Sequence, residues 1–383
     1  MDRLCSGSEG AGMILCANPR AQYLAQQAEI DAAIARVLNN GRYILGEEEQ
    51  AFEEEFSAYV GVPYGVGVGS GTDALYLALA ACQIGEGDEV ITVSHTAVAT
   101  VAAIELAGAT PVLIDIERDF FTLDPNKLEA AITSRTKAII PVHIYGQPAD
   151  LDPILDIATR HNLRVIEDCA QAHGAIYKGT RVGARGDIGC FSFYPTKNLG
   201  AIGDGGMIVT KDAALAERAR LLREYGWAER YVSHIPGGNS RLDELQAAIL
   251  RAKLRTLDDS NQKRIGIAQQ YNECLSDNGL ILPRMREDTT HVFHLYVVRV
   301  PERHMAQEYL QSRDVNTLVH YPVPVHLQPA YHHRLRVPAQ MRETESAAQE
   351  ILSLPMYPEL SQENTQQVID NLRSFMLARQ PVN

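Results

Sequence analysis

The chain has few cysteines for its length and no C-x-x-C pair. Its six cysteines, at positions 5, 16, 82, 169, 190 and 274, lie far apart in a sequence of 383 residues. This spacing indicates neither a disulfide framework nor a zinc site, and the 12 histidines add no metal-binding pattern. We therefore expect free thiols in a reducing compartment and no metal centre.

The sequence also lacks an export signal and a run apolar enough to cross a membrane. Residues 1–12 are small and polar, without a basic start followed by an apolar core. The most apolar stretch, 91–116, includes His95, Glu105 and Asp115 and consists mostly of small or β-branched residues. These absences predict a cytoplasmic protein in which residues 1–17 form a disordered lead-in.

Positive charge is in short supply as well. The formal net charge of −13 argues against nucleic acid or a membrane as a partner, although a few local arginines or lysines could still hold a small anion. Apolar residues at 45% and charged residues at 22% are typical of a soluble globular protein. Because 383 residues exceed one ordinary hydrophobic core, we expect a large domain over 18–255 and a small one over 256–383.

Short apolar runs alternate with helical stretches from about residue 65 to residue 210. The expected strands are 64–68, 89–93, 110–114, 138–143, 164–166, 188–193 and 206–210. The expected helices among them include 73–82, 96–107, 151–161 and 212–225. This alternation predicts an α/β fold with a mostly parallel seven-stranded sheet between layers of helices. Ligands of such sheets gather at the carboxyl ends of the strands.

The pattern changes toward the C-terminus. One long helix is expected over 241–275, with Asn239 and Ser240 as candidate caps. Beyond it we expect strands at 292–300 and 318–321 and helices at 305–313, 341–352 and 362–379. These segments predict a small α+β domain, joined by an N-terminal helix over 22–38.

Lys197 lies between a buried-looking strand and the glycine-rich stretch 203–206. Burial lowers the pKa of a lysine, so that its neutral amine can form a Schiff base with an aldehyde. About thirty residues earlier, Asp168 ends another apolar run. Such an amine, together with an aspartate that can pair with a pyridinium nitrogen, is what pyridoxal phosphate chemistry requires. Because most lysines are surface residues, the spacing alone leaves a structural role for Lys197 open.

A glycine-rich turn over 66–72 joins an expected strand to an expected helix. Its backbone N–H groups and the positive helix end could hold a phosphate, to which Ser70 and Thr72 would add hydroxyl donors. No lysine follows the glycines as in a Walker loop, and the turn is not a dinucleotide fingerprint. Such turns are also common structural devices, so both interpretations stay open. Ser192 could reach the same phosphate or could be an ordinary outward strand residue.

Other polar side chains follow the expected strands. His95 could stack on an aromatic cofactor or could be a structural histidine. Glu167 and Asp168 are neighbours on one strand, so only one of them can face a site at its end.

The proline-stiffened segment 320–326 brings two histidines and a tyrosine close together in the sequence. These residues, His320, Tyr321 and His326, could line a sugar pocket or could belong to a surface loop.

Together these motifs resemble the sugar-nucleotide aminotransferases of the DegT/DnrJ/StrS group, pyridoxal-phosphate-dependent enzymes with the aspartate aminotransferase fold, fold type I. The resemblance starts at about residue 18 and covers nearly the whole chain from there. The motifs that carry it are residues 41–46, 71–75, 167–174, 192–198 and 239–248.

The resemblance implies a role for each matched residue. Lys197 is similar to the Schiff-base lysine that also moves protons, and Asp168 to the partner of the pyridine nitrogen. Gln171 matches the residue near the ring hydroxyl, and His95 occupies the ring-stacking position. The implied phosphate ligands are Gly71, Thr72, Ser192 and, from the neighbouring subunit, Asn239. A homodimer with shared active sites follows from the last of these.

The reaction implied is a ping-pong transfer of the amino group of L-glutamate to a nucleotide-linked keto sugar. Segments 96–100, 143–147 and 320–331 look more like members that act on 3-keto sugars, so we expect amination at C3 of a dTDP- or UDP-linked sugar. A 4-keto sugar, a keto-inositol or an acyclic keto sugar remains an alternative, because pocket residues vary freely.

A non-catalytic regulatory homologue that binds pyridoxal phosphate is a second alternative, although it would be expected to lack the lysine or the aspartate. Dehydratases of the same family carry histidine where this chain has Lys197, which disfavours them. Candidates for binding the sugar diphosphate are Lys178, Arg181 and Arg223, each of which could equally be a surface charge.

Overall fold

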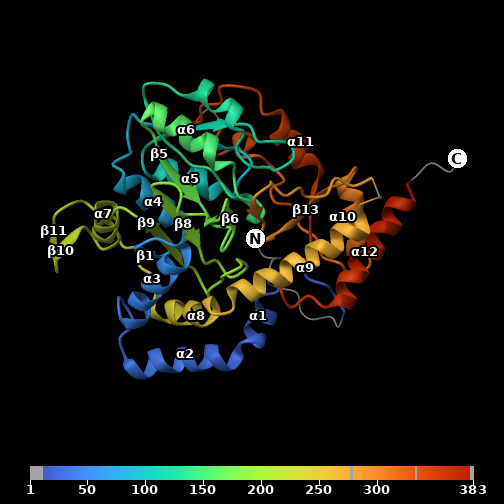
Figure 1. The fold of residues 1–383 in the computed structure, drawn as a ribbon, viewed down its shortest axis with the longest axis horizontal. Coiled ribbons are helices and arrows are strands. Elements are labelled where there is room, and N and C mark those ends of the chain that lie inside the picture. The colour runs from blue at the N-terminus through green and yellow to red at the C-terminus, as the bar shows by residue number, and fades with distance from the viewer. Residues whose placement is uncertain (1–11, 277–278, 333, 380–383) are drawn as a thin grey trace.

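The computed structural model describes residues 12–276, 279–332 and 334–379. Its centre is a seven-stranded sheet with the strand order β1-β9-β8-β5-β4-β2-β3, in which β9 alone runs against its neighbours (Figure 1). The strands are β1 Tyr64–Val68, β2 Glu89–Val93, β3 Thr110–Ile114, β4 Thr136–Ile139, β5 Arg164–Asp168, β8 Ile188–Ser192 and β9 Gly206–Thr210. The predicted α/β fold with a mostly parallel sheet is confirmed.

Helices cover both faces of this sheet. They are α3 Glu47–Val60, α4 Gly71–Ala81, α5 Val98–Leu106, α6 Leu151–His161, α7 Ala213–Arg223 and α8 Glu244–Leu254. Successive residues of β9 show how the faces divide, because Ile208 packs with the helix α4 residues and Met207 with Phe52 and Leu250 of α3 and α8. This one-residue alternation is what a strand buried on both sides requires.

The region predicted as one helix over 241–275 is two helices, α8 and α9 Leu257–Leu275. The helix breaks at Thr256, whose hydroxyl donates to Gln26 Oε1 and to the Lys253 carbonyl at 3.2 Å each. Ser240 does not cap α8. Its hydroxyl accepts a hydrogen bond from Gly69 N at 2.9 Å and donates one to Asp73, which ties the start of α8 to the turn before α4.

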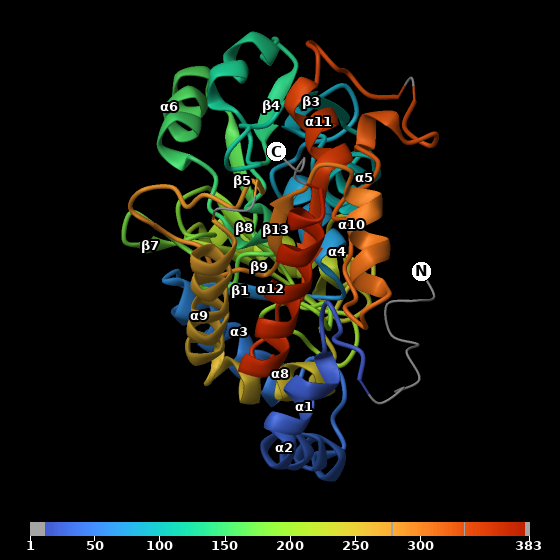
Figure 2. The same cartoon turned by 90° about the vertical axis from the view of Figure 1, so that its right-hand side faces the viewer.

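A second, smaller core lies at the C-terminal side. A two-stranded antiparallel sheet, β13 Tyr296–Arg299 and β14 Ile351–Leu354, packs with α10 Arg303–Gln311, α12 Gln362–Leu377 and the C-terminal part of α9 around Tyr271, Leu310 and Phe375. Helix α11 Arg342–Glu350 lies beside β13 and packs its Ala347 into the core of the large sheet. Helix α12 lies between α9 and α10 (Figure 2). Residues 318–321 do not form the predicted strand, because only Leu318 pairs, with Ser353.

The N-terminal helix is α1 Pro19–Ala25 followed by α2 Gln27–Asn40. The apolar stripe of α2, with Ala33 and Val37, packs against Ala248 of α8, while Gln26 between α1 and α2 bonds Thr256 of the predicted small domain. The prediction of a disordered lead-in over 1–17 falls partly on residues 1–11, outside the described residues. It is wrong for the part that is described, since Ile14 is buried and pairs with Val315.

Two smaller β-structures lie outside the seven-stranded sheet. A β-hairpin of β10 Trp227–Glu229 and β11 Val232–Ser233 projects at the far left of Figure 1, on the side of the sheet away from the small core. A three-stranded sheet joins β6 Ile176–Tyr177, β7 Thr180–Arg181 and β12 Thr289–Thr290.

Of the cysteines, Cys16, Cys82, Cys169, Cys190 and Cys274 are free thiols, while Cys5 lies outside the described residues. In the described part of the chain, no helix combines the length and apolar character needed to span a membrane.

The aromatic cluster under α3 gives a test of this packing. The fully buried ring of Phe56 has the rings of Phe191, Phe193 and Phe52 at centroid distances of 4.9, 5.3 and 5.6 Å. Phe56→Ala should lower the free energy of unfolding by about 3–5 kcal/mol, because it leaves a cavity between rigid rings. In the same urea titrations Leu106→Ala, at a side chain that is 64% exposed, should change it by less than about 0.5 kcal/mol. Equal losses for the two variants would contradict the assigned core.

Candidate active site

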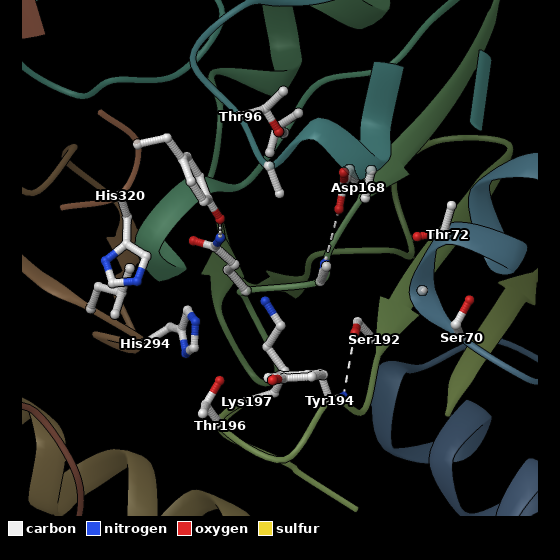
Figure 3. Close-up of a pocket in the computed structure, with 18 of the residues that line it drawn as sticks. Ser70, Thr72, Thr96, Asp168, Ser192, Tyr194, Thr196, Lys197, His294 and His320 are labelled. Carbon is white, nitrogen blue, oxygen red and sulfur yellow. Dashed lines mark hydrogen bonds between the residues drawn. The ribbon is translucent and has the colours of Figure 1, made fainter. Parts of the chain in front are cut away.

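A cavity of about 320 Å³ opens where β1, β5 and β8 end, against residues of the small core (Figure 3). The large domain contributes the turn before α4, Asp168 at the end of β5 and Ser192 at the end of β8. Leu295, Leu318 and the pair His320 and Tyr321 close it from the other side. The site therefore lies at the carboxyl ends of the strands, as the sequence predicted.

Lys197 reaches this cavity from a tight turn that follows β8. Its backbone N–H bonds the Tyr194 carbonyl at 2.8 Å. Only glycine fits at position 200, where a Cβ would lie 2.4 Å from the Pro195 carbonyl oxygen. The buried Lys253 amine holds the same turn by donating to the Gly200 carbonyl at 2.6 Å. Burial lowers the pKa of Lys197 to about 8, against an opposing effect of Asp168. The amine is thus far closer to neutrality at physiological pH than a surface lysine.

Asp168 is the acidic group of the cavity and is 5% exposed. Its two oxygens accept hydrogen bonds from the Thr100 hydroxyl at 2.8 Å and from Ala170 N at 3.1 Å. The Thr100 hydroxyl is bonded in turn to that of Thr96 at 2.9 Å. Burial raises the pKa of Asp168, while these donors and the Lys197 cation lower it. Glu167 does not line the cavity, as expected for the residue next to it on a strand.

The turn before α4 offers an anion site on the third side. Ser70 caps the helix by accepting a hydrogen bond from Asp73 N at 3.1 Å, which leaves the N–H groups of Gly71 and Thr72 at the helix N-terminus beside the cavity. A Cβ on Gly71 would lie 2.5 Å from Ser192 Cβ, so no larger residue fits against the end of β8. Backbone donors and the helix dipole at this point favour a bound phosphate.

His95 is not among the described residues that line the cavity. Its ring is buried and its Nε2 lies 2.6 Å from Tyr145 Oη, which donates its own proton to the His320 carbonyl. Nε2 must therefore carry the hydrogen, and burial lowers the pKa of this imidazole to about 4. Gln171 joins the same network, because it accepts from Tyr145 N at 2.7 Å and donates to Tyr321 Oη at 3.0 Å. Tyr145 and Gln171 thus connect the sheet to the segment that holds His320 and Tyr321.

Several predicted site residues lie elsewhere. His326 is not brought to the cavity, because Ser94 Oγ at 2.7 Å and Glu345 Oε1 at 3.2 Å engage its two ring nitrogens. Asn239 is exposed and lies outside the cavity of its own chain. None of the three candidates for the diphosphate lines the cavity either. Lys178 pairs with Asp152, Arg181 with Asp258, and Arg223 is buried between Glu49 and Glu53.

The sequence analysis missed some polar residues of this region. Tyr194, Thr196 and His294 line the cavity beside Lys197 (Figure 3). Thr100 and Tyr145 act on Asp168 and His95 from positions that do not touch the cavity. Tyr194 and Thr196 could have been found from their nearness to Lys197 in the sequence. No local signal marks His294. Thr100 and Tyr145 lie within the segments 96–100 and 143–147, but only tertiary packing shows what they contact.

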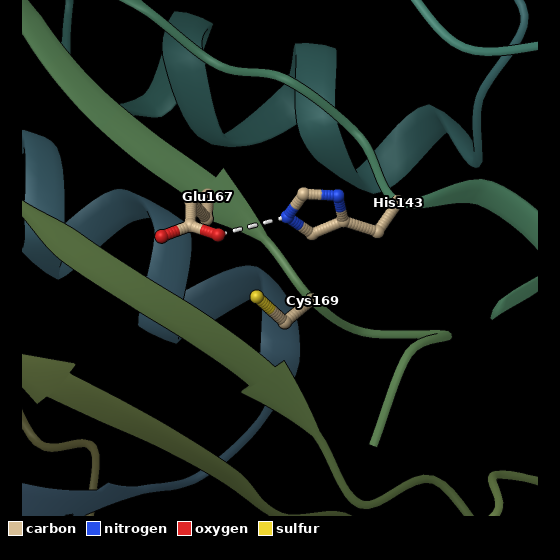
Figure 4. A group of neighbouring side chains, drawn as sticks. All are labelled: His143, Glu167 and Cys169. Carbon is tan, nitrogen blue, oxygen red and sulfur yellow. Dashed lines mark hydrogen bonds and ion pairs between the residues drawn. The ribbon is translucent and has the colours of Figure 1, made fainter. Parts of the chain in front are cut away.

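His143, Glu167 and Cys169 form a compact buried group behind the cavity, with ligand-type atoms within 4.8 Å of one another (Figure 4). Hydrogen bonds already fill it. His143 Nδ1 accepts from Ala149 N, so its Nε2 donates to Glu167 at 3.0 Å. The Glu167 oxygens also accept from the backbone N–H groups of Gly183, Arg185 and Gly186. Burial raises the pKa of the Cys169 thiol well above its usual value. These hydrogen bonds hold the end of β5 in place, so the group has a structural role.

The side chains fit pyridoxal 5′-phosphate. The amine of Lys197 can meet an aldehyde, the carboxylate of Asp168 can face a ring nitrogen, and the turn of Gly71 and Thr72 can take a phosphate. A phosphorylated pyridine aldehyde needs these three groups around one cavity. The fold and this site define a pyridoxal-phosphate-dependent enzyme of the aspartate aminotransferase-like fold.

Comparison with known proteins gives the family. A model described as the DegT/DnrJ/EryC1/StrS aminotransferase family matches residues 25–373, and the chain belongs to this family, whose members use pyridoxal 5′-phosphate. It is 49% identical to a dTDP-3-amino-3,4,6-trideoxy-alpha-D-glucose transaminase of Streptomyces venezuelae, over 93% of this chain and 94% of that protein. It is 50% identical to a dTDP-3-amino-3,6-dideoxy-alpha-D-galactopyranose transaminase of Aneurinibacillus thermoaerophilus, over 91% and 96%.

Among solved structures, the chain is similar to S. venezuelae DesV in complex with a ketimine intermediate. The TM-score is 0.94 at 47% identity, covering 97% of this chain and all of the other (100%). Together with the family match, this identifies the chain as a sugar aminotransferase of the transaminase class.

The glycine at position 71 allows a direct test of the phosphate cradle. Gly71→Ala should weaken binding of pyridoxal 5′-phosphate to the apoprotein by about tenfold or more, because the added methyl displaces Ser192 from the helix N-terminus. Gly266→Ala is the matched control, since a Cβ there, within α9, meets nothing within 4 Å. Fluorescence titration of the two apoproteins measures both affinities. Unchanged affinity of Gly71→Ala would show that the phosphate lies elsewhere.

Proposed function

We propose that this protein moves the amino group of L-glutamate to C3 of a dTDP- or UDP-linked 3-keto sugar. The observation that carries the proposal is that the half-buried Lys197, whose pKa is lowered, shares one cavity with Asp168 and the turn of Gly71. The products would be 2-oxoglutarate and a 3-amino sugar nucleotide. Family membership supports the sugar aminotransferase class, and the finer assignment rests on the arguments below.

The roles of the side chains follow from their charge and position. When bound, pyridoxal 5′-phosphate supplies an electron-withdrawing ring that takes up the electron pair left when a proton leaves carbon. Lys197 would anchor the aldehyde carbon through its amine and later carry that proton between the two carbons involved. Asp168 would accept the hydrogen bond of the ring N–H, with Thr100 keeping the carboxylate oriented and ionised. Gln171 would lie near the ring hydroxyl, and Gly71, Thr72 and Ser192 would hold the phosphate.

Two observations support C3 as the sugar carbon that receives the amino group. Both transaminases compared above are named for products that carry the amine at C3. His320 and Tyr321, in the segment that looks like members acting on 3-keto sugars, line the cavity beside Lys197. We place the sugar on this side of the cavity, opposite the phosphate turn.

A homodimer with shared sites is part of the proposal. Asn239 is exposed in its own subunit and pairs with Glu224, just before the hairpin of β10 and β11. The side chains of Tyr225, before the hairpin, and Tyr231, at its tip, are exposed as well. A second copy that covered this surface would bring Asn239 to the phosphate of the neighbouring site. A location in the cytoplasm remains a prediction.

The substrate assignment can be tested with the purified protein loaded with pyridoxal 5′-phosphate. Glutamate should convert it to the aminated form with release of 2-oxoglutarate. Single-turnover reaction of that form with a panel of 3-keto and 4-keto sugar nucleotides, read by mass spectrometry, should give an amino sugar only from the 3-keto compounds. Amination of the 4-keto compounds alone would overturn the C3 assignment, and no reaction with glutamate would overturn the donor.

Subunit mixing tests the shared site. Lys197→Ala and Asn239→Ala should each be inactive, whereas hybrid dimers contain one site with both residues intact. Random one-to-one mixing should therefore restore about a quarter of the wild-type activity per subunit. Native mass spectrometry of the mixture, which separates hybrid from parent dimers by mass, serves as the control for subunit exchange. Confirmed exchange without recovery would place each site within a single subunit.

A further inference from the structure

His294 is a buried polar side chain in the cavity without a role so far. It lies just before β13 and is 6% exposed, and its ring faces the cavity between Lys197 and His320 (Figure 3). Its Nδ1 has no hydrogen-bond partner, and no hydrogen bond joins Nε2 to another described residue. Nδ1 is covered by the protein, so Nε2 is the nitrogen that a species bound in the cavity can reach.

The other histidines near the cavity differ from His294 in this respect. His320 anchors its Nδ1 on Ser353 Oγ at 2.8 Å. His173 also lacks partners, but it is enclosed by the aromatic rings of Phe56, Phe191 and Phe193 and does not line the cavity. Only His294 combines a cavity position with a ring that the protein leaves unbonded, as far as the described histidines show.

The imidazole of His294 is neutral. Burial, first of all, and then the cations of Lys197 and Arg264 lower its pKa well below the usual range. A neutral imidazole has one N–H donor and one acceptor nitrogen. It can donate to or accept from a hydroxyl and can donate to a carbonyl oxygen, whereas a carboxylate is bound more strongly by a cation.

The rest of the cavity wall also offers mostly neutral polar groups. Among its described residues, Lys197 is the only lysine or arginine, beside the acids Asp168 and Asp204. The remaining polar groups on the side of the small core are neutral, namely the imidazole of His320 and the phenol of Tyr321. Neutral donors and acceptors of this kind match a sugar ring, with its neighbouring hydroxyl and keto oxygens.

We propose that His294 binds the sugar of the acceptor, through a hydrogen bond between a ring nitrogen and a hydroxyl or keto oxygen. This inference rests on the proposed function and adds a substrate-binding residue to it. Because glutamate offers no hydroxyl, loss of the imidazole affects the sugar half of the reaction and spares the glutamate half.

The test compares His294→Phe, which keeps a flat ring, with His294→Gln, which keeps a neutral donor and acceptor. Each protein is loaded with pyridoxamine 5′-phosphate, which cannot exchange its amine with an amino sugar. The probe is dTDP-3-amino-3,6-dideoxy-α-D-galactose, and its dissociation constant is measured by calorimetry. His294→Phe should bind it at least about tenfold more weakly, and His294→Gln should stay within about threefold of wild type. The rate of the glutamate half-reaction should change by less than about twofold in both variants.

His161→Phe, at a partly exposed histidine of α6 paired with Glu129, is the control and should match wild type in every assay. Cofactor loading and the melting temperature show that each variant is folded. The inference is overturned if His294→Phe binds the probe as tightly as wild type, or if it slows the glutamate half-reaction as much as it weakens the probe. If wild-type protein binds neither this probe nor a UDP-linked 3-amino sugar, the proposed sugar substrate is contradicted instead.

Discussion

The burial of the Lys197 amine beside the Asp168 carboxylate is the interaction on which the site depends. Desolvation brings the pKa of the amine down to about 8 and raises that of the carboxyl, while each group partly offsets the shift of the other. Two ionisable groups removed from water cost free energy unless hydrogen bonds hold them. Thr100 meets this requirement for the acid, and the turn clamped by Lys253 fixes the backbone from which the amine extends.

The topology of the sheet explains why these groups meet. Three strands end at one edge, and each delivers one part of the site: the phosphate turn after β1, the acid on β5, and the lysine turn after β8. The approach of these ends is close, as the steric limit at Gly71 shows. The small core then closes the cavity through Tyr145 and Gln171, which bond the His320 carbonyl and the Tyr321 hydroxyl. The proposed sugar pocket is thus built at the junction of the two cores, whereas the proposed cofactor site belongs to the large one.

Local patterns in the sequence predict the large sheet and the residues at its strand ends. The strand alternation, the glycine turn and the residues Lys197 and Asp168 are encoded within short windows. The mostly parallel sheet is therefore confirmed, and the residues predicted to hold the cofactor lie around one cavity. Contacts between distant segments decide the rest. The expected helix 241–275 breaks at Thr256, whose hydroxyl contacts Gln26, and Ile14 pairs with Val315. His326 and His294 are the same residue type on neighbouring segments, and only tertiary packing shows that the first is engaged by Ser94 and the second faces the cavity.

The most direct measurement is the rate at which the apoprotein captures pyridoxal 5′-phosphate as a function of pH. The link is reduced with borohydride and located by peptide mapping. The account predicts a single labelled peptide containing Lys197, with a rate that levels off above about pH 8, where the buried amine is neutral, and falls about tenfold per unit below it. A label at another lysine, or a rate that keeps rising to the pKa of an exposed lysine near about 10.4, would contradict it.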